Sequence, residues 1–154
     1  MIYVTGGAGF IGSRIIKKMQ EDNDMTSVDF FDVCERHEDV KEVNTLNPYK
    51  FLSEFESLIQ AGDVVLHQGA CSDTMNHDPN VMMNLNFNYS KDLFDKCQQQ
   101  GITMIYASSA AVYGSGQNGF VVDENSENPL NLYAKSKKLF DDYVRCFSSR
   151  LAAQ

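Results

Sequence analysis

A tyrosine and a lysine in the carboxyl-terminal part of the sequence have the spacing of a proton-transfer pair. Tyr133 and Lys137 form Y-x-x-x-K within the segment YAKSK. Residues four apart share one face of a helix, so the Lys137 ammonium is expected beside the Tyr133 hydroxyl. A neighbouring positive charge favours the phenolate. Tyr133 is therefore a candidate general base near neutral pH.

A serine is the second polar candidate. Ser109 lies in the segment ASSAA, at the end of an apolar run that predicts a strand. Its hydroxyl can hydrogen-bond a substrate hydroxyl and steady the transfer of that proton to Tyr133. A tyrosine and a lysine at this spacing also occur on ordinary surface helices. A surface helix is the alternative for this segment taken by itself.

Three glycines near the start of the chain have the spacing G-x-x-G-x-x-G. Gly6, Gly9 and Gly12 follow a short apolar strand and precede a helical apolar pattern. In a dinucleotide-binding βαβ unit the first glycine permits the tight turn and the second lets the backbone approach the pyrophosphate. The third lets the helix pack close to the strand. The pyrophosphate binds the free N–H groups of the helix start. A plain tight turn is the alternative.

An acidic residue after the second predicted strand favours the dinucleotide interpretation. Asp29 follows the glycines by about 20 residues, where the fingerprint places the acid that binds the ribose hydroxyls. A carboxylate would repel the 2′-phosphate of NADP, so Asp29 favours NAD. Arg36 and Lys41 are nearby cations that could still accept NADP.

The elements that must position these residues alternate along the sequence as in βαβ units. The predicted strands cover residues 2–5, 25–29, 42–46, 64–67 and 102–107. The predicted helices cover residues 11–21, 51–60, 79–100 and 132–149. We expect an α/β fold, a Rossmann-type doubly wound parallel sheet with strand order 3-2-1-4-5, as a single domain over residues 1–154. Ligand is expected at the carboxyl ends of the first and fourth strands.

Composition excludes several classes of function. The 154 residues are 43% hydrophobic and 22% charged, which suits one globular domain. The net charge of −8 without a basic cluster disfavours nucleic-acid binding. No apolar run approaches the roughly 18 residues of a membrane span. Because the first strand begins at Ile2, no room remains for a signal peptide, and a cytoplasmic protein is expected. The four scattered cysteines predict free thiols and no metal site.

Together these residues resemble a known family. The chain is similar to the extended short-chain dehydrogenase/reductases and, among them, to the ADP-L-glycero-D-manno-heptose 6-epimerases. The segments that carry the resemblance are VTGGAGFIGS (4–13), HQGACSDT (67–74), MMNLNFNYSK (82–91), IYASSAAVYG (105–114) and PLNLYAKSKKLFDDYVR (129–145). Ala110 and Ala111 argue against a sugar 4,6-dehydratase, which carries an Asp-Glu pair there.

The resemblance implies a set of site residues. Tyr133, Lys137 and Ser109 match the catalytic residues of the family, and Lys137 also matches a cofactor contact. The other implied cofactor contacts are Gly6, Gly9, Phe10, Ile11, Gly12, Asp29, Phe30, Gln68, Gly69, Ala70, Cys71, Ser72 and Asn86. The implied cofactor is NAD or NADP, and NAD is favoured. Phe30 and Leu85 stand where the family usually carries asparagine.

The implied activity is that of an isomerase, a nucleotide-sugar epimerase that acts by transient hydride transfer to the nicotinamide. Members of the family are about twice as long, so this chain resembles their amino-terminal half, without the carboxyl-terminal substrate domain and its second base. A non-catalytic dinucleotide-binding fragment or module is one alternative, and an interaction scaffold is another. A nucleotide sugar is the expected substrate. An open edge at the fifth strand, flanked by the last two helices, predicts a homodimer or higher homo-oligomer.

Overall fold

The computed structural model describes residues 1–152, and the side chains of residues 1–148. The chain forms two compact units. The first unit consists of residues 1–70 and 92–107, and the second consists of residues 71–91 and 108–152. Each unit therefore combines segments that are separated in the sequence. None of the described helices is both long enough and apolar enough to cross a bilayer.

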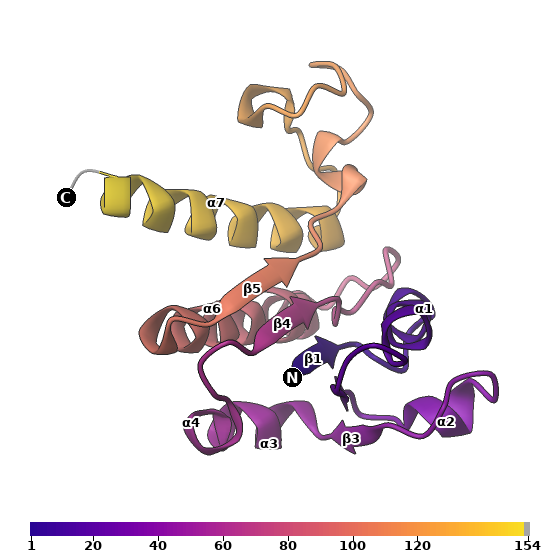
Figure 1. Cartoon of the computed structure of the whole chain (residues 1–154). Helices are drawn as coiled ribbons and strands as arrows, with labels where there is room; N and C mark the ends of the chain where they lie inside the picture. The colour runs from indigo at the N-terminus through magenta and orange to yellow at the C-terminus, as the bar shows by residue number, and fades with distance from the viewer. Residues whose placement is uncertain (153–154) are drawn as a thin grey trace. The chain divides into compact units, whose positions relative to one another are not determined.

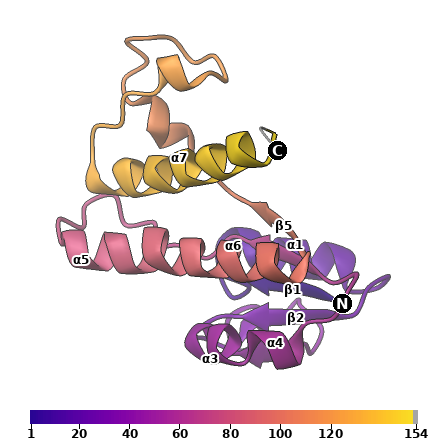
Figure 2. The ribbon, with the colours of Figure 1, turned by 90° about the vertical axis from the view of Figure 1, so that its left-hand side faces the viewer.

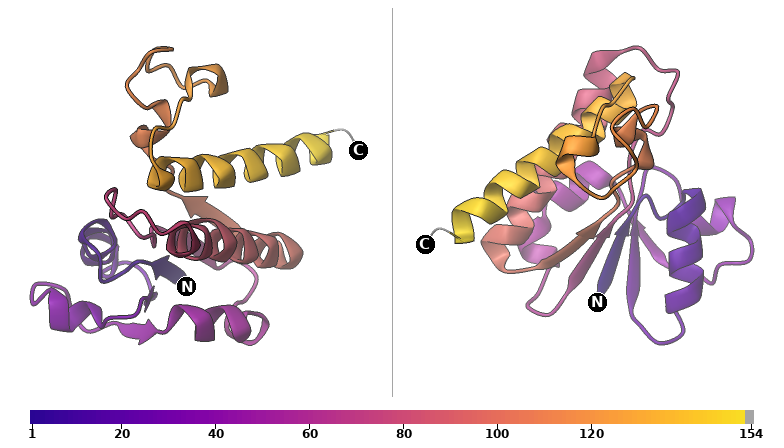
Figure 3. Two further views of the ribbon diagram at one scale, coloured as in Figure 1. Left: turned by 180° about the vertical axis from the view of Figure 1, so that it is seen from behind. Right: turned by 90° about the horizontal axis from the view of Figure 1, so that it is seen from above.

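A five-stranded sheet is the centre of the first unit (Figure 1; Figure 3, right). Its strands are β1 (Ile2–Thr5), β2 (Met25–Val28), β3 (Asn44–Leu46), β4 (Val64–His67) and β5 (Thr103–Tyr106). All neighbours pair in parallel, in the order β3-β2-β1-β4-β5. The predicted strand order and fold class are confirmed. β1 lies in the middle of the sheet, and the carboxyl end of every strand lies at the same edge.

Helix α1 (Phe10–Met19) packs on one face of this sheet. The buried cluster there joins Val4 of β1 to Ile16 of α1 and extends to Met25, Val33 and Val40. Because successive side chains of a strand point to opposite faces, Tyr3 faces the other way. Each face thus has its own apolar contacts.

Helices α3 (Pro48–Ser53) and α4 (Phe55–Leu58) cover the opposite face. The Tyr3 ring stacks on Phe51 with ring centroids 5.1 Å apart, and the Tyr3 hydroxyl donates to the Leu58 carbonyl at 2.8 Å. An ion pair of 2.6 Å between Lys96 and Glu56 joins helix α6 (Tyr89–Gln100) to α4. The sheet is therefore covered on both faces, as a parallel sheet requires.

Two helical segments differ from the sequence prediction because polar side chains cap them. The helix predicted over residues 51–60 begins at Pro48, since Asn47 caps it, and breaks at Glu54 into α3 and α4. The segment after β2, for which no helix was predicted, contains helix α2 (Val33–Arg36), whose first amides donate to the Asp32 carboxylate. Both caps act over two or three residues, too short a range for a periodic apolar pattern to reveal.

The second unit contains helix α5 (Pro79–Met82), a π-helical segment, η1 (Met83–Asn88), and the last helix of the chain. Helix α5 continues without a break into η1 (Figure 2). Helix α7 (Leu132–Ala152) is the last element. The helices predicted over 79–100 and 132–149 are confirmed. The intervening segment, for which no helix was predicted, holds two 3₁₀ turns, η2 (Ala110–Tyr113) and η3 (Glu124–Ser126).

Candidate active site

The glycine turn brings the ends of β1 and β4 into contact. Gly6 has a φ of +68°, and a Cβ atom at this position would lie 2.7 Å from the backbone N and Cα atoms of Gly69. A Cβ atom at Gly12 would overlap the Gly6 carbonyl oxygen. The turn therefore accepts only glycine at the first and third positions of the motif, which agrees with the roles predicted for Gly6 and Gly12.

The middle glycine faces open space. A Cβ atom at Gly9 would meet only the Gly6 oxygen, at 3.1 Å. Gly9 is the N-cap of α1 and provides no side chain to cap the amides of the first turn. Phe10 and Ile11, which follow it, are 81% and 58% exposed. The turn thus presents amide groups beside apolar surface, an arrangement that fits a dinucleotide phosphate.

Asp29 ties the glycine turn to the end of β2. Its Oδ2 atom accepts from the Ala8 amide at 3.0 Å, and its Oδ1 atom accepts from the Phe30 amide at 2.7 Å. The carboxylate is held in place by the backbone and remains partly exposed. Its predicted contact with ribose hydroxyls stays a prediction.

The segment after β4 is fixed to β1 by a hydrogen-bonded threonine. Thr5 Oγ1 accepts from the Gly69 amide at 3.0 Å and lies 2.6 Å from His67 Nδ1. The Gln68 amide donates to the Thr5 carbonyl at 3.1 Å. Gln68, Gly69 and Ala70, three predicted cofactor contacts, therefore lie at the carboxyl edge of the sheet together with the glycine turn.

In the second unit, Asn86 links two segments of the chain. Its Oδ1 atom accepts from the Cys71 amide at 2.7 Å. Its Nδ2 group donates to the Cys71 carbonyl and to Ser136 Oγ, each at 3.0 Å. Asn86 is fully buried, whereas Ser72 is exposed. The structure shows what Asn86 does inside the protein, and the cofactor contacts of Cys71, Ser72 and Asn86 stay predictions.

Tyr133 and Lys137 lie one turn apart on α7. Lys137 is only 4% exposed, and Tyr133 is half-buried. Burial lowers the pKa of Lys137, and the negative charge of Asp141 partly opposes this shift. Within the side chains that the structure describes, neither the Tyr133 hydroxyl nor the Lys137 ammonium has a hydrogen-bond or ion-pair partner. Both groups are therefore available to a ligand.

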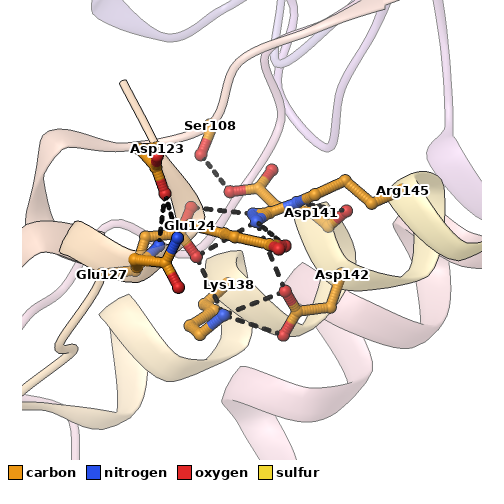
Figure 4. Close-up of polar contacts among 9 residues, drawn as sticks. Ser108, Asp123, Glu124, Glu127, Lys138, Asp141, Asp142 and Arg145 are labelled. Carbon is orange, nitrogen blue, oxygen red and sulfur yellow. Dashed lines mark hydrogen bonds and ion pairs between the residues drawn. The ribbon is translucent and has the colours of Figure 1, made fainter. Parts of the chain in front are cut away.

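Ser109 is the N-cap of the 3₁₀ turn η2. Its Oγ atom accepts from the Ala111 amide at 3.2 Å, which leaves its hydroxyl hydrogen available to donate. The neighbouring Ser108 donates to Asp141 Oδ2 (Figure 4). Asp141 and its contact with Ser108 were not predicted from the sequence. The spacing of Asp141, four residues after Lys137, was the available signal.

Comparison with known proteins decides the family. Residues 2–150 match the NAD dependent epimerase/dehydratase family. The chain belongs to this family. It is 42% identical to the ADP-L-glycero-D-manno-heptose-6-epimerase of Brachyspira hyodysenteriae, over 94% of this chain and 48% of that protein.

Solved structures of other epimerases have the same fold. The ADP-L-glycero-D-manno-heptose-6-epimerase of Helicobacter pylori superposes with a TM-score of 0.82 at 30% identity, over 95% of this chain and 50% of that one. The UDP-glucose 4-epimerase of Thermus thermophilus, in complex with NAD, gives 0.77 at 26% identity, over 97% and 51%. The chain spans about half the length of these relatives.

These findings confirm several predictions made from the sequence. The resemblance to extended epimerases, the Rossmann-type fold and the nicotinamide cofactor class agree with the family and its structures. The four cysteines are free thiols, as predicted. The individual site residues and the single-domain boundary stay predictions.

Proposed function

We propose that this chain binds NAD and takes part in nucleotide-sugar epimerisation, by reversible oxidation of a substrate carbon that bears a hydroxyl group. The observation that carries the proposal is the pair on α7. Lys137 is buried and without a partner among the described side chains, one turn after Tyr133, in a chain of the epimerase/dehydratase family. A buried ammonium without a direct hydrogen bond or ion pair is costly for folding alone, which favours a chemical role.

The residues of the first unit fit the cofactor. The amides at the start of α1 would hold the pyrophosphate, since Gly9 leaves their side open. The Asp29 carboxylate would accept from ribose hydroxyls and disfavour a 2′-phosphate. Phe10 and Ile11 would be covered by the bound dinucleotide. NAD, when bound, supplies a reversible acceptor for the hydride.

The residues of the second unit would move the proton. Tyr133 accepts the proton of the substrate hydroxyl as a general base and returns it in the reverse step. The Lys137 ammonium, one helical turn from Tyr133, stabilises the negative charge at the reacting oxygen by Coulombic attraction and can donate to a ribose hydroxyl. Ser109 donates a hydrogen bond to the reacting oxygen and so orients it.

The proposed substrate is an ADP-activated heptose, because the relatives named for this activity include proteins 42% and 30% identical to the chain. Other structures of the same fold belong to 4-epimerases of UDP sugars, so a UDP sugar is the competing substrate. A cytoplasmic location and a homodimer remain part of the proposal. The free cysteines support the location.

The second candidate is a module that binds the dinucleotide without turnover. It is favoured by the division of the chain, because the first unit alone holds the glycine turn and Asp29 and none of Tyr133, Lys137 and Ser109. Inversion at carbon needs proton delivery on both faces of the sugar. The implied second base belongs to the part of the relatives that this chain does not align with.

Calorimetric titration with NAD, combined with a turnover assay, tests the proposal. Gly9→Val places a branched side chain where the pyrophosphate would approach, and we expect it to abolish binding. Ala61→Val, at an exposed position outside the predicted site, is the matched control. NAD binding with conversion of ADP-heptose supports the enzyme. Binding without conversion supports the module. Equal affinities of the wild type and Gly9→Val would exclude the proposed cofactor site.

NADP in the same titration tests the cofactor preference. We expect NAD to bind at least tenfold more tightly, a difference of about 1.4 kcal/mol. The reverse order would show that Asp29 does not select the cofactor.

A further inference from the structure

Asp141 is a buried carboxylate on α7, one helical turn after Lys137. The residue is 6% exposed. Its Oδ2 atom accepts from the Ser108 hydroxyl (Figure 4). Its Oδ1 atom is buried and has no hydrogen-bond partner among the described residues. Taking an ionised carboxylate out of water is costly unless a positive charge compensates it.

Lys137 is likewise a buried charged residue, of the opposite sign. Its side chain is also buried, and it too lacks a direct partner in the described part of the chain. Residues four apart lie on the same helix face, so Asp141 and Lys137 are neighbours although they form no direct ion pair. Opposite charges interact strongly in a partly dehydrated interior. Burial lowers the pKa of Lys137, and the charge of Asp141 acts to raise it.

Among the other charged groups on this part of α7, Lys135 is exposed, and Lys138, Asp142 and Arg145 have partners of their own. Lys138 bonds with Glu127 at 2.8 Å and with Asp142 at 2.9 Å, and Arg145 bonds with Glu127 at 2.8 Å (Figure 4). Lys91 of α6 lies over the Tyr143 ring.

The remaining elements that pack against α7 contribute little charge. The segments α5 and η1 contain no ionisable side chain, and η2 contributes only Tyr113. Asp141 is thus the one carboxylate, among those described, that acts on the charge of Lys137.

We propose that Asp141, anchored by Ser108, is a positioning residue that keeps Lys137 protonated and held beside Tyr133. The inference rests on the proposed function, because it explains how a buried lysine can supply positive charge beside the reacting group of Tyr133. Asp141 acts through Lys137 and does not itself touch the substrate or cofactor. Three residues at four-residue spacing on α7 then act together: Tyr133 as the base, Lys137 as the ammonium beside it, and Asp141 as the carboxylate that stabilises the ammonium.

The test measures the protonation of Lys137 directly in the whole chain. The lysine side chains are labelled with ¹³C at Cε. The Lys137 resonance is identified as the one that disappears in Lys137→Met. Its NMR chemical shift is then followed against pH to give the pKa of Lys137. We expect Asp141→Asn to move the pKa of Lys137 further below its usual range. The Asn side chain keeps an acceptor for Ser108, so only the charge is lost.

Asp142→Asn is the matched control. It removes the same charge from the next residue of the same helix, and Asp142 bonds with Lys138 instead. We expect the pKa of Lys137 to stay at its wild-type value in this variant. An equal shift in both variants, or no shift in Asp141→Asn, would overturn the proposal.

Ser108→Ala tests the anchor and keeps the proposal open to refutation if Asp141→Asn does not fold. Ser108 is exposed, so its truncation leaves the helix intact. Without the hydrogen bond from Ser108 the Asp141 carboxylate can turn away from Lys137. We therefore expect the pKa of Lys137 to fall, by less than in Asp141→Asn. An unchanged value would refute the anchoring role. None of these readouts requires cofactor or turnover. If the protein does not bind NAD but the pKa of Lys137 still falls in Asp141→Asn, the result would therefore count against the proposed function alone.

Discussion

Single residues of the glycine turn carry two separate constraints, backbone conformation and space. Gly6 and Gly62 both have positive φ, +68° and +93°. Only at Gly6 would a Cβ atom collide with the backbone, that of Gly69, whereas nothing lies within 4 Å at Gly62. The pair allows the two constraints to be separated by experiment.

We predict that Gly6→Ala destabilises the protein more than Gly62→Ala. Left-handed backbone costs an alanine about 1–2 kcal/mol at either position. The collision adds about 1–3 kcal/mol at Gly6 alone, since backbone cannot rotate away as a side chain can. Urea unfolding followed by circular dichroism measures both losses. Equal losses would mean that the contact between the ends of β1 and β4 is loose.

At this scale, the sequence predicted residues whose partners are close in the chain. The spacing of Gly6, Gly9 and Gly12 and the four-residue step from Tyr133 to Lys137 are local patterns, and the structure places all five on the expected turn and helix. The contacts of Asn86 with Cys71 and Ser136 join positions 15 and 50 residues apart. No local pattern indicates such pairs.

Among the elements, α7 forms its ion pairs with the preceding segment mainly through one glutamate. Glu127 has a side chain only 8% exposed, and it accepts from Lys138 and Arg145, each at 2.8 Å (Figure 4). Glu124 is 66% exposed and reaches Arg145 at 3.6 Å. The two glutamates lie three residues apart and differ in burial, which makes them a matched pair.

We predict that Glu127→Gln costs about 1–3 kcal/mol of unfolding free energy, because it weakens hydrogen bonds to two charged groups at a buried site. Glu124→Gln should cost well under about 1 kcal/mol, as exposed ion pairs do. Urea unfolding of both variants against the wild type is the measurement. A larger loss at Glu124 would contradict the assignment of Glu127 as the main contact.

The same contact predicts a dependence on pH. Burial disfavours the Lys138 ammonium, but its hydrogen bonds with Glu127 and Asp142 outweigh burial and raise its pKa above the usual 10.5. The folded state therefore holds this proton more tightly than the unfolded state. Its contribution to stability is fully present below pH 10.5 and is lost as pH rises through the raised pKa.

The stability difference between the wild type and Glu127→Gln should accordingly shrink at alkaline pH. It should not vanish, because Arg145 stays charged. Unfolding free energies of both proteins at neutral pH and above pH 10.5 provide the measurement. If this difference in unfolding free energy grew with pH, it would contradict the raised pKa of Lys138.

The limits of prediction differ among the elements. β1, β4 and α7 follow from apolar periodicity, because each buries one face or two. The start of α3 after Asn47 and the helix capped by Asp32 each depend on side-chain bonds to two backbone amides. The π-helical turns of η1 also have no signature in the apolar pattern.

For the whole molecule, the sheet order was predictable because parallel crossovers have one hand and leave few arrangements. The division into two units was not, since each unit is assembled from segments far apart in the sequence. Only long-range contacts define such a division.

The open edge of the sheet leads to a prediction about association. β5 ends the sheet, and Ile105 on it is 56% exposed. We expect a homo-oligomer at micromolar concentration, and we expect Ile105→Lys to shift it toward monomer, since a charge on an edge strand opposes pairing. Light scattering measures the mass.

Val122→Lys is the control for this experiment. Val122 is 93% exposed and apolar but belongs to no strand, so its replacement should leave association unchanged. An equal effect of both substitutions would indicate nonspecific association through exposed apolar side chains and not pairing at the β5 edge.

The interleaving of the two units also has a consequence for the order in which the chain folds during synthesis. All five strands have left the ribosome once residue 107 has emerged, so the sheet can form early. Asn86 must wait for Ser136, 50 residues later. At about 5–20 residues per second this delay is about 3 to 10 s. For that interval the residues between the fourth and fifth strands lack the partners that later bury them, which makes them the natural target of chaperones and proteases.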